Sequence, residues 1–347
     1  MSQTGVTRGK FAKCEARRNY GATTAPGINS GGFPPLGGYH SLWIEGIHMP
    51  QPESHATRDL AGDLATSLLE DVSYLVSPPD VCVKVFELIE SNDAAAQEIG
   101  EVISRDPSLT ARLLRLVNSA FYSYSRRIDT VSRAITVVGV RELYSLVIAV
   151  SAIKSFSNLP NSLVNIDTFW RHGIYTGLIA RALAKRCRVL HPERMFVAGM
   201  LHDIGSLVLY NRMPEVCSDL LLVCDGDEGI LHQAELAELG FTHADLGGAL
   251  LNTWMLPETL QEAVGYHHMP SYAMQSELEA SIVHLADNLA NRSLIGAFCE
   301  HPSEAAAVDA STWAAIGVDE NRFDYDAVIG EAGLQFTETA GLLLARA

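Results

Sequence analysis

The chain has 347 residues, of which 48% are hydrophobic and 19% are charged, and its formal net charge is −16 at pH 7. These values describe a globular protein with room for two domains or subdomains, and the negative charge argues against nucleic acid or an anionic membrane as a partner. No apolar run approaches the ~20 residues of a membrane span, the N-terminus lacks the apolar segment of a secretory signal, and the six cysteines form no CxxC pair. We therefore expect a cytoplasmic protein with reduced cysteines.

Residues 1–55 differ in composition from the rest of the chain. Glycine and proline recur throughout this stretch, and its basic residues contrast with the acidic remainder. It clusters too little apolar surface to offset the entropy that ordering it would cost. The composition predicts a disordered N-terminal arm.

From residue 56 to residue 158 the apolar residues recur at helical spacing. Leu109, Leu113, Leu116 and Val117 form the stripe of a core-facing helix, which should begin just before them at an Asp-Pro-Ser sequence. We predict that this segment is an N-terminal helical lobe.

A stretch rich in proline and asparagine at 157–161 separates the first lobe from a second, which we place at 159–293. Residues 294–347 alternate short helical pieces with turns and form a predicted C-terminal helical extension. We find no alternating apolar pattern long enough for a strand and no internal repeat. The fold class that the sequence predicts is all-α.

Seven polar residues of the second lobe interrupt otherwise apolar helical patterns. Each lies near a predicted helix end or on an inward helix face, where an imidazole or a carboxylate needs a partner. One of them follows Thr242, which with Asp245 predicts a capping box, and two end the helix that Pro257 opens. The other histidines of this part of the chain, His191, His232 and His284, have no comparable placement. The seven are His172, His202, Asp203, His243, His267, His268 and Asp287.

These seven residues have the ligand types of a metal site, because neutral imidazole and carboxylate both bind divalent Fe, Mn, Zn and Ni. One ion could be held by His172, His202, Asp203 and Asp287. Asp203 could bridge to a second ion held by the three remaining histidines, since a carboxylate has two oxygens. In hydrolytic enzymes such a pair activates water and binds a phosphoryl group. Hydrogen-bonded structural roles for each histidine, and a buried ion pair for Asp287, are the alternatives.

With the run VISRDPSLTARLLRLVNS at 102–119 and the later AGMLHDIG at 198–205, the chain resembles the HDOD family, the HD-related output domain of bacterial signalling proteins, over about residues 73–293. The resemblance implies a helical bundle in two lobes, with an HD-superfamily-like second lobe that contains the metal site. The matching stretches are VSPP (76–79), VISRDPSLTARLLRLVNS (102–119), FWRH (169–172), AGMLHDIG (198–205), ELGFTHA (238–244), WMLP (254–257) and YHHMP (266–270).

The sequence departs from the related HD-GYP phosphodiesterases at two places. Those enzymes carry a lysine directly after the HDIG run, where a cation neutralises phosphate charge in the transition state, whereas this chain has Ser206. They also carry a glutamate and a Gly-Tyr-Pro turn after the paired histidines, and this chain has neither. HDOD proteins are similar in this respect and are regarded as regulatory modules without established enzymatic activity.

Three hypotheses follow for the function. The resemblance favours a non-catalytic signalling module that acts through protein partners and holds a mononuclear or dinuclear metal site, with iron as the first expectation and Mn, Zn or Ni as alternatives. The second hypothesis is a metal-dependent phosphohydrolase or cyclic-dinucleotide phosphodiesterase. The third is a metal-free helical domain whose histidines hydrogen-bond one another. The sequence does not indicate the signalling partner, the input signal or the oligomeric state.

Overall fold

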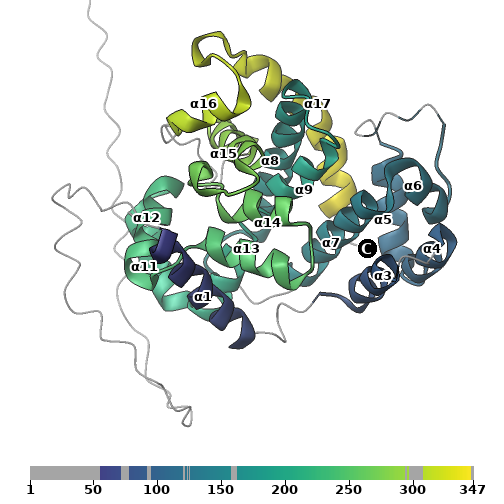
Figure 1. Ribbon diagram of the computed structural model, residues 1–347, viewed down its shortest axis with the longest axis horizontal. Coiled ribbons are helices and arrows are strands. Elements are labelled where there is room, and N and C mark those ends of the chain that lie inside the picture. Colours follow the sequence, from purple (N-terminus) through teal and green to yellow (C-terminus); the bar gives the residue numbers. More distant parts are fainter. Residues whose placement is uncertain are drawn as a thin grey trace, which may run out of the picture. The chain divides into compact units, whose positions relative to one another are not determined.

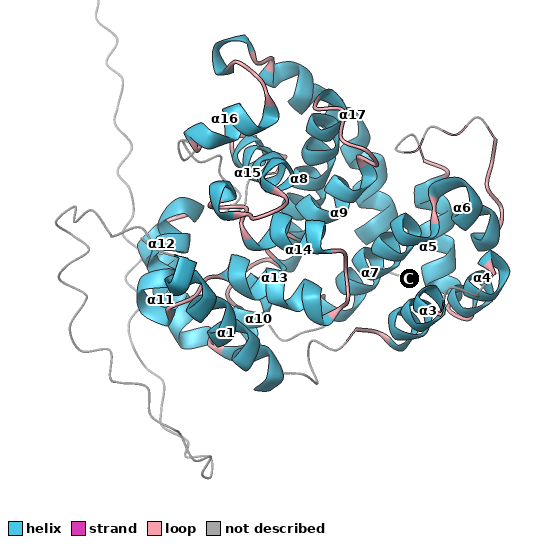
Figure 2. Cartoon of the chain, viewed as in Figure 1, coloured by secondary structure: helices cyan, strands magenta, loops and turns pink. Residues whose placement is uncertain are grey.

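The computed structural model describes residues 55–71, 78–91, 95–119, 122, 124, 126–157, 162–293, 295–296 and 308–344. Within these ranges every regular element is a helix and none is a strand (Figure 2), which confirms the predicted all-α class. The predicted disordered arm lies outside the described residues, except for residue 55.

The helices form two groups along the chain (Figure 1). Helices α3 to α7 make up the first group and α8 to α15 the second, while α17 packs along α8 and also contacts α5 and α7. Helix α1 packs against α13 of the second group.

Helix α1 spans His55–Asp71, and in the first group the bounds are α3 Asp80–Glu90, α4 Ala96–Ser104, α5 Pro107–Val117, α6 Val131–Val138 and α7 Val140–Phe156. In the second they are α8 Ile166–Arg186, α9 Glu193–Leu201, α10 Ile204–Arg212, α11 Pro214–Cys224, α12 Glu228–Leu239, α13 His243–Thr253, α14 Glu258–Gly265, η2 Pro270–Tyr272 and α15 Glu277–Asn291. The chain continues with α16 Ala310–Ile316, η3 Glu320–Arg322 and α17 Tyr325–Leu344.

Helix α5 shows how local sequence sets these bounds. The Asp106 carboxylate accepts hydrogen bonds from Ser108 N at 2.9 Å and Leu109 N at 3.0 Å, which satisfies two of the free amides at the helix start. Pro107 occupies the first helical position, where a missing N–H has no consequence. The apolar stripe predicted from the sequence is buried along this helix, as expected.

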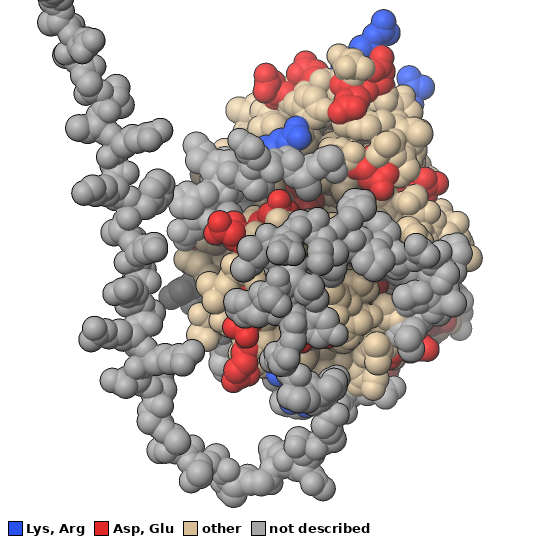
Figure 3. Space-filling model, turned by 90° about the vertical axis from the view of Figure 1, so that its left-hand side faces the viewer, with Lys and Arg blue, Asp and Glu red and all other residues tan. Residues whose placement is uncertain are grey.

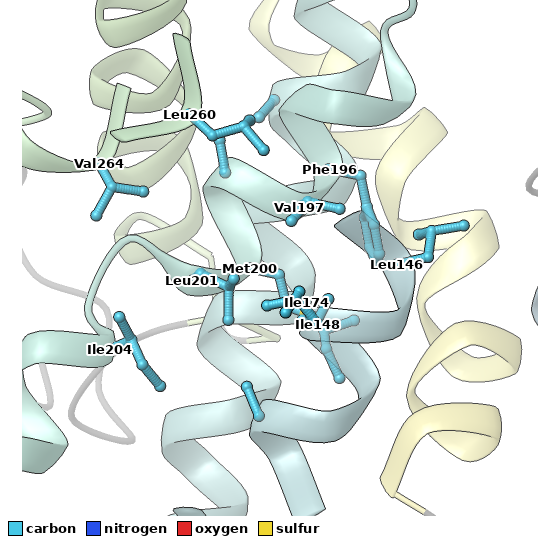
Figure 4. Packing of buried hydrophobic residues seen from close by; sticks show 14 of the residues in the cluster. Leu146, Ile148, Ile174, Phe196, Val197, Met200, Leu201, Ile204, Leu260 and Val264 are labelled. Carbon is cyan, nitrogen blue, oxygen red and sulfur yellow. The ribbon is translucent and has the colours of Figure 1, made fainter. Parts of the chain in front are cut away.

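Helix α9 lies in the middle of the core and leads directly to His202. Figure 4 shows its apolar side chains between those of neighbouring helices, with Phe196 beside Leu146 of α7 and Val197 below Leu260 of α14. All of these side chains are almost completely buried. The position of His202 is therefore fixed by packing on several sides of α9.

Two helices of this core touch through their backbones. A Cβ atom on Gly177 of α8 would lie 2.5 Å from the Phe196 carbonyl oxygen of α9, and one on Gly199 would lie 2.8 Å from Gly177 Cα. Only glycine allows this separation. The close approach brings the end of α9, and so His202, beside His172 of α8.

The described surface is mainly acidic where it is charged. In the face shown in Figure 3, Asp and Glu side chains are spread over the surface, and the described Lys and Arg side chains visible there form no continuous patch.

None of the helices in the described ranges is both long and apolar enough to cross a membrane.

The glycine contact predicts a specific loss of stability. We expect Gly177→Ala to lower the free energy of unfolding by about 1–3 kcal/mol, because the added methyl group forces α8 and α9 apart. Urea denaturation followed by circular dichroism measures the change. The control is Gly330→Ala on an exposed face of α17, where a Cβ meets nothing within 4 Å, and here we expect stability to stay the same or to rise by up to about 1 kcal/mol. Equal changes in the free energy of unfolding for the two substitutions would contradict the proposed importance of the close contact between α8 and α9.

Candidate metal centre

The structure brings the seven predicted residues together inside the second group of helices. They come from α8, from the turn between α9 and α10, from the first residue of α13, from the turn after α14 and from α15. His268 is half-buried and the other six are buried. The prediction that the paired histidines end the Pro257 helix is wrong: α14 ends at Gly265, and the pair lies in the turn that follows.

The first predicted ligand group converges on the Nε2 atoms of two histidines. His172 Nε2 lies 3.2 Å from Asp287 Oδ1 and 3.3 Å from His202 Nε2. His202 Nε2 in turn lies 3.2 Å from Asp203 Oδ2. The spacing of these nitrogen and oxygen atoms is compatible with one ion bound between them.

The second group lies on the other side of Asp203. His243 Nε2 is 3.0 Å from His268 Nε2, and with His267 these rings form a second cluster that could hold an ion. Asp203 Oδ1 is 3.4 Å from His243 Nε2 and 3.8 Å from His267 Nε2, while its Oδ2 faces His202. Asp203 therefore sits between the two groups, as a bridging carboxylate would.

Four of the five histidines have their ring orientation fixed by an acceptor at Nδ1. A neutral imidazole that donates through Nδ1–H has a lone pair on Nε2, which is the form that binds a metal. Here the Nε2 atoms all face the cluster, and two lone pairs about 3 Å apart repel each other unless a proton or a cation lies between them. The Nδ1 contacts are His172 to Gly296 O at 2.6 Å, His202 to Gly199 O at 2.8 Å, His267 to Val264 O at 2.6 Å and His243 to a Glu235 carboxylate oxygen at 2.6 Å.

The charge distribution of the cluster also favours a bound cation. Burial opposes ionisation of Asp203 and Asp287, yet the adjacent histidines hold the pKa of both carboxyl groups below its usual range. Burial would lower the pKa of His202, but the two aspartates raise it well above its usual value. At His267, burial and the neighbouring charged histidines lower the pKa to about 3. Without a metal, the negative charge is thus balanced only by protons on part of the histidine set, which a metal ion would displace.

Unpaired atoms at the cluster fit a metal ion as well. Asp203 Oδ2, Glu228 Oε1 and His267 Nε2 are buried and have no hydrogen-bond partner among the described residues. In the same part of the chain the carboxylates of Asp203, Glu228 and Asp287 form ion pairs only with histidines and none with lysine or arginine. Mixed imidazole and carboxylate donors of this kind suit Fe, Mn, Zn or Ni.

Several residues outside the predicted ligand set lie beside this site. His232 and His284 were not predicted to have an inward placement, but both are buried next to the cluster. The His232 ring lies 4.7 Å from the His268 ring, and His284 Nδ1 hydrogen-bonds His267 O at 2.8 Å. His191 does lie elsewhere, 3.9 Å from Glu142. The sequence analysis also missed the acidic and amide residues around the cluster, Glu228, Glu235 and Asn291.

Residues 75–270, more than half of the chain, match the HDOD domain family. The chain belongs to this family. Its order of motifs, with the histidine-aspartate pair between α9 and α10 and the paired histidines after α14, is therefore that of an HDOD protein.

Two solved structures share the fold of this HDOD chain. A Geobacter sulfurreducens HDOD domain protein with unknown function is 25% identical, with a TM-score of 0.62 over 82% of this chain and 97% of that one. A Shewanella amazonensis SB2B protein, provisionally named a phosphohydrolase, is 24% identical, with a TM-score of 0.59 over 80% and 97%. The second likeness concerns the fold alone. The two-lobed all-α architecture is thus the HDOD fold.

A curated relative from Treponema pallidum (strain Nichols), named only as an uncharacterized protein, is 28% identical over 207 residues. The match covers 59% of this chain and 40% of the relative. The HDOD chain thus spans less than half of that protein's length.

The contact of Glu235 with His243 gives a testable role for a residue outside the ligand set. We expect Glu235→Gln to weaken metal binding by about 10- to 100-fold, because it removes the charged acceptor that orients the ring and raises its basicity. Competition against a chromophoric chelator measures the affinity for Zn²⁺ and Mn²⁺. Glu238→Gln on the same helix is the matched control, because Glu238 forms no hydrogen bond or ion pair with the cluster among the described residues, and it should bind as the unchanged protein does. Equal affinities for the two variants would contradict this role.

Proposed function

We propose that this HDOD protein is a non-catalytic signalling module that acts through protein partners, and that a divalent metal site stabilises its second lobe. The observation that carries the proposal is a cluster that has the donors for metal ions but, among the residues that the structure describes, has no lysine or arginine paired with it to bind a phosphate group. The position after the His202–Gly205 motif is Ser206, which is only 1% exposed. A buried hydroxyl there has no charge with which to stabilise a phosphoryl transition state.

In this proposal the ions are held by the seven predicted residues, and their role is structural. A bound divalent ion would supply positive charge that the buried carboxylates and imidazole lone pairs require. The ligands come from α8, α13, α15 and two turns, so that their shared contacts hold these segments in one arrangement. That arrangement is what a protein partner would recognise.

A phosphohydrolase is the second candidate, and one observation favours it. Asp203 faces the two ligand groups with different oxygens, which is how a bridging carboxylate is arranged in two-metal hydrolytic sites. The ions would polarise a phosphoryl oxygen and activate a water in such an enzyme. The S. amazonensis protein of the same fold also carries the phosphohydrolase name.

Metal content and turnover separate the candidates. We expect protein purified without a His tag or chelator to contain one or two metal ions per chain by elemental analysis and to hydrolyse neither cyclic dinucleotides nor a generic phosphodiester. The double variant His202→Ala with Asp203→Ala should lose the metal, because it removes ligands from both groups. His191→Asn, which changes a histidine far from the cluster, is the control and should keep it.

Each other outcome rejects part of the proposal. Turnover that disappears in the double variant would make the protein a phosphohydrolase. Absence of metal after reconstitution with Fe²⁺, Mn²⁺, Zn²⁺ and Ni²⁺ would leave the cluster as a hydrogen-bonded polar core.

A further inference from the structure

Glu228, the first residue of α12, extends its side chain into the metal centre. The side chain is 9% exposed, and Oε1 lies 3.8 Å from His172 Nε2 with no hydrogen-bond partner of its own. The other oxygen, Oε2, accepts a hydrogen bond from Asn291 Nδ2 at 2.5 Å. The same amide donates to Asp287 Oδ1 at 2.9 Å, so Asn291 holds two carboxylates side by side.

This arrangement places a third carboxylate on the first ligand group. Oxygens of Asp203 and Glu228 and a ring nitrogen of His172 all lie within 4.8 Å of one another, a spacing compatible with a shared ion. Like charges this close in a buried setting repel strongly unless a cation or a proton neutralises one of them. One amide from Asn291 cannot supply that charge. Glu228 Oε1, which has no hydrogen-bond partner among the described residues, is the atom available to bind a cation.

Helix α12 reaches both ligand groups from one face. Glu228, His232 and Glu235 are spaced i, i+4 and i+7, so they share a side of the helix. The His232 ring lies beside the His268 ring at a tilt, and Glu235 Oε2 contacts both the backbone N–H and the ring Nδ1 of His243. Among the described helices, α12 packs mainly against α11, its neighbour in the chain (Figure 1). These side chains connect α12 to both ligand groups, in addition to its buried apolar residues Leu231 and Ala234.

We propose that Glu228 is an additional ligand of the ion held by His172, His202, Asp203 and Asp287, and that this ion thereby fastens α12 to the core. The inference rests on the proposed metal site and names a ligand that the sequence motifs do not contain. It makes α12 the part of the fold whose position depends most directly on metal occupancy. An alternative role for Glu228 is a hydrogen-bonded residue at a helix N-terminus, where acidic side chains are common.

The test compares Glu228→Gln with Glu238→Gln, which carries the same change three residues beyond Glu235 on α12. We expect Glu228→Gln to weaken the binding of Mn²⁺ and Zn²⁺ by at least about 10- to 100-fold, while Glu238→Gln binds normally. The visible absorption of Co²⁺-loaded protein, which reports ligand type and number, should change only in Glu228→Gln. Unchanged affinity and an unchanged Co²⁺ spectrum in Glu228→Gln would overturn the proposal.

Hydrogen exchange of the unmodified protein gives a second measurement that needs no variant. We expect amides of residues 228–239 to exchange at least about tenfold faster after metal removal, with a smaller change in α5, which lies in the other lobe. Equal changes in both helices would overturn the fastening of α12. If the unmodified protein bound no metal, the proposed function itself would fail. Normal metal binding together with an unaffected Glu228→Gln would reject this inference alone.

Discussion

The structure depends on one constraint: three carboxylates and five imidazoles meet inside an apolar helical core with no lysine or arginine paired to the carboxylates in the described residues. Buried charge of this kind is unfavourable unless it is paired or coordinated. The residues around the cluster form hydrogen bonds to the imidazoles and to the carboxylates. Backbone carbonyls and Glu235 fix the imidazole rings, and the Asn291 amide donates to the carboxylates of both Asp287 and Glu228.

Small residues make this convergence geometrically possible. The contact of Gly177 with α9 brings two histidine-bearing segments together, and Gly205 serves the same purpose at the start of α10. A Cβ on Gly205 would meet the His243 carbonyl oxygen and would lie 2.7 Å from Gly247 N. The glycine of the HDIG run thus allows the Asp203 turn to lie directly against α13. The glycines allow the backbones to approach closely, and this approach positions the candidate ligands.

Much of the site could be predicted from the sequence, because its members interrupt apolar stripes or follow helix-start signals. The Thr242–Asp245 capping box, for example, is present as expected and positions His243 at the first turn of α13. Glu228 gave no such signal, since an acidic residue in a first helical turn is common on any soluble helix. His232 and His284 were missed for a related reason. Both histidines reach the cluster only because of how α12 and α15 pack in the fold, and the local spacing of residues does not indicate that packing.

The boundary of α14 was also beyond local reasoning. The helical pattern after Pro257 continues through His268, but the helix ends at Gly265 and the two histidines turn back toward the cluster. His267 N has only a long 3.5 Å contact with Val264 O, while its ring nitrogen Nδ1 takes the same carbonyl at 2.6 Å. The side chain competes with the backbone for an acceptor, and the helix stops.

One imidazole outside the proposed ligand set connects the candidate metal centre to the C-terminal part of the chain. His284 faces the His267 carbonyl through Nδ1 and accepts from Asp309 N at 3.1 Å through Nε2, and Asp309 caps α16. Burial lowers the pKa of this ring, so a single neutral tautomer satisfies both contacts. The turn that carries the paired histidines and the start of α16 are therefore mechanically coupled. By thermodynamic reciprocity, a ligand bound at one end of this connection that changed affinity at the other end would have its own affinity changed by the same factor.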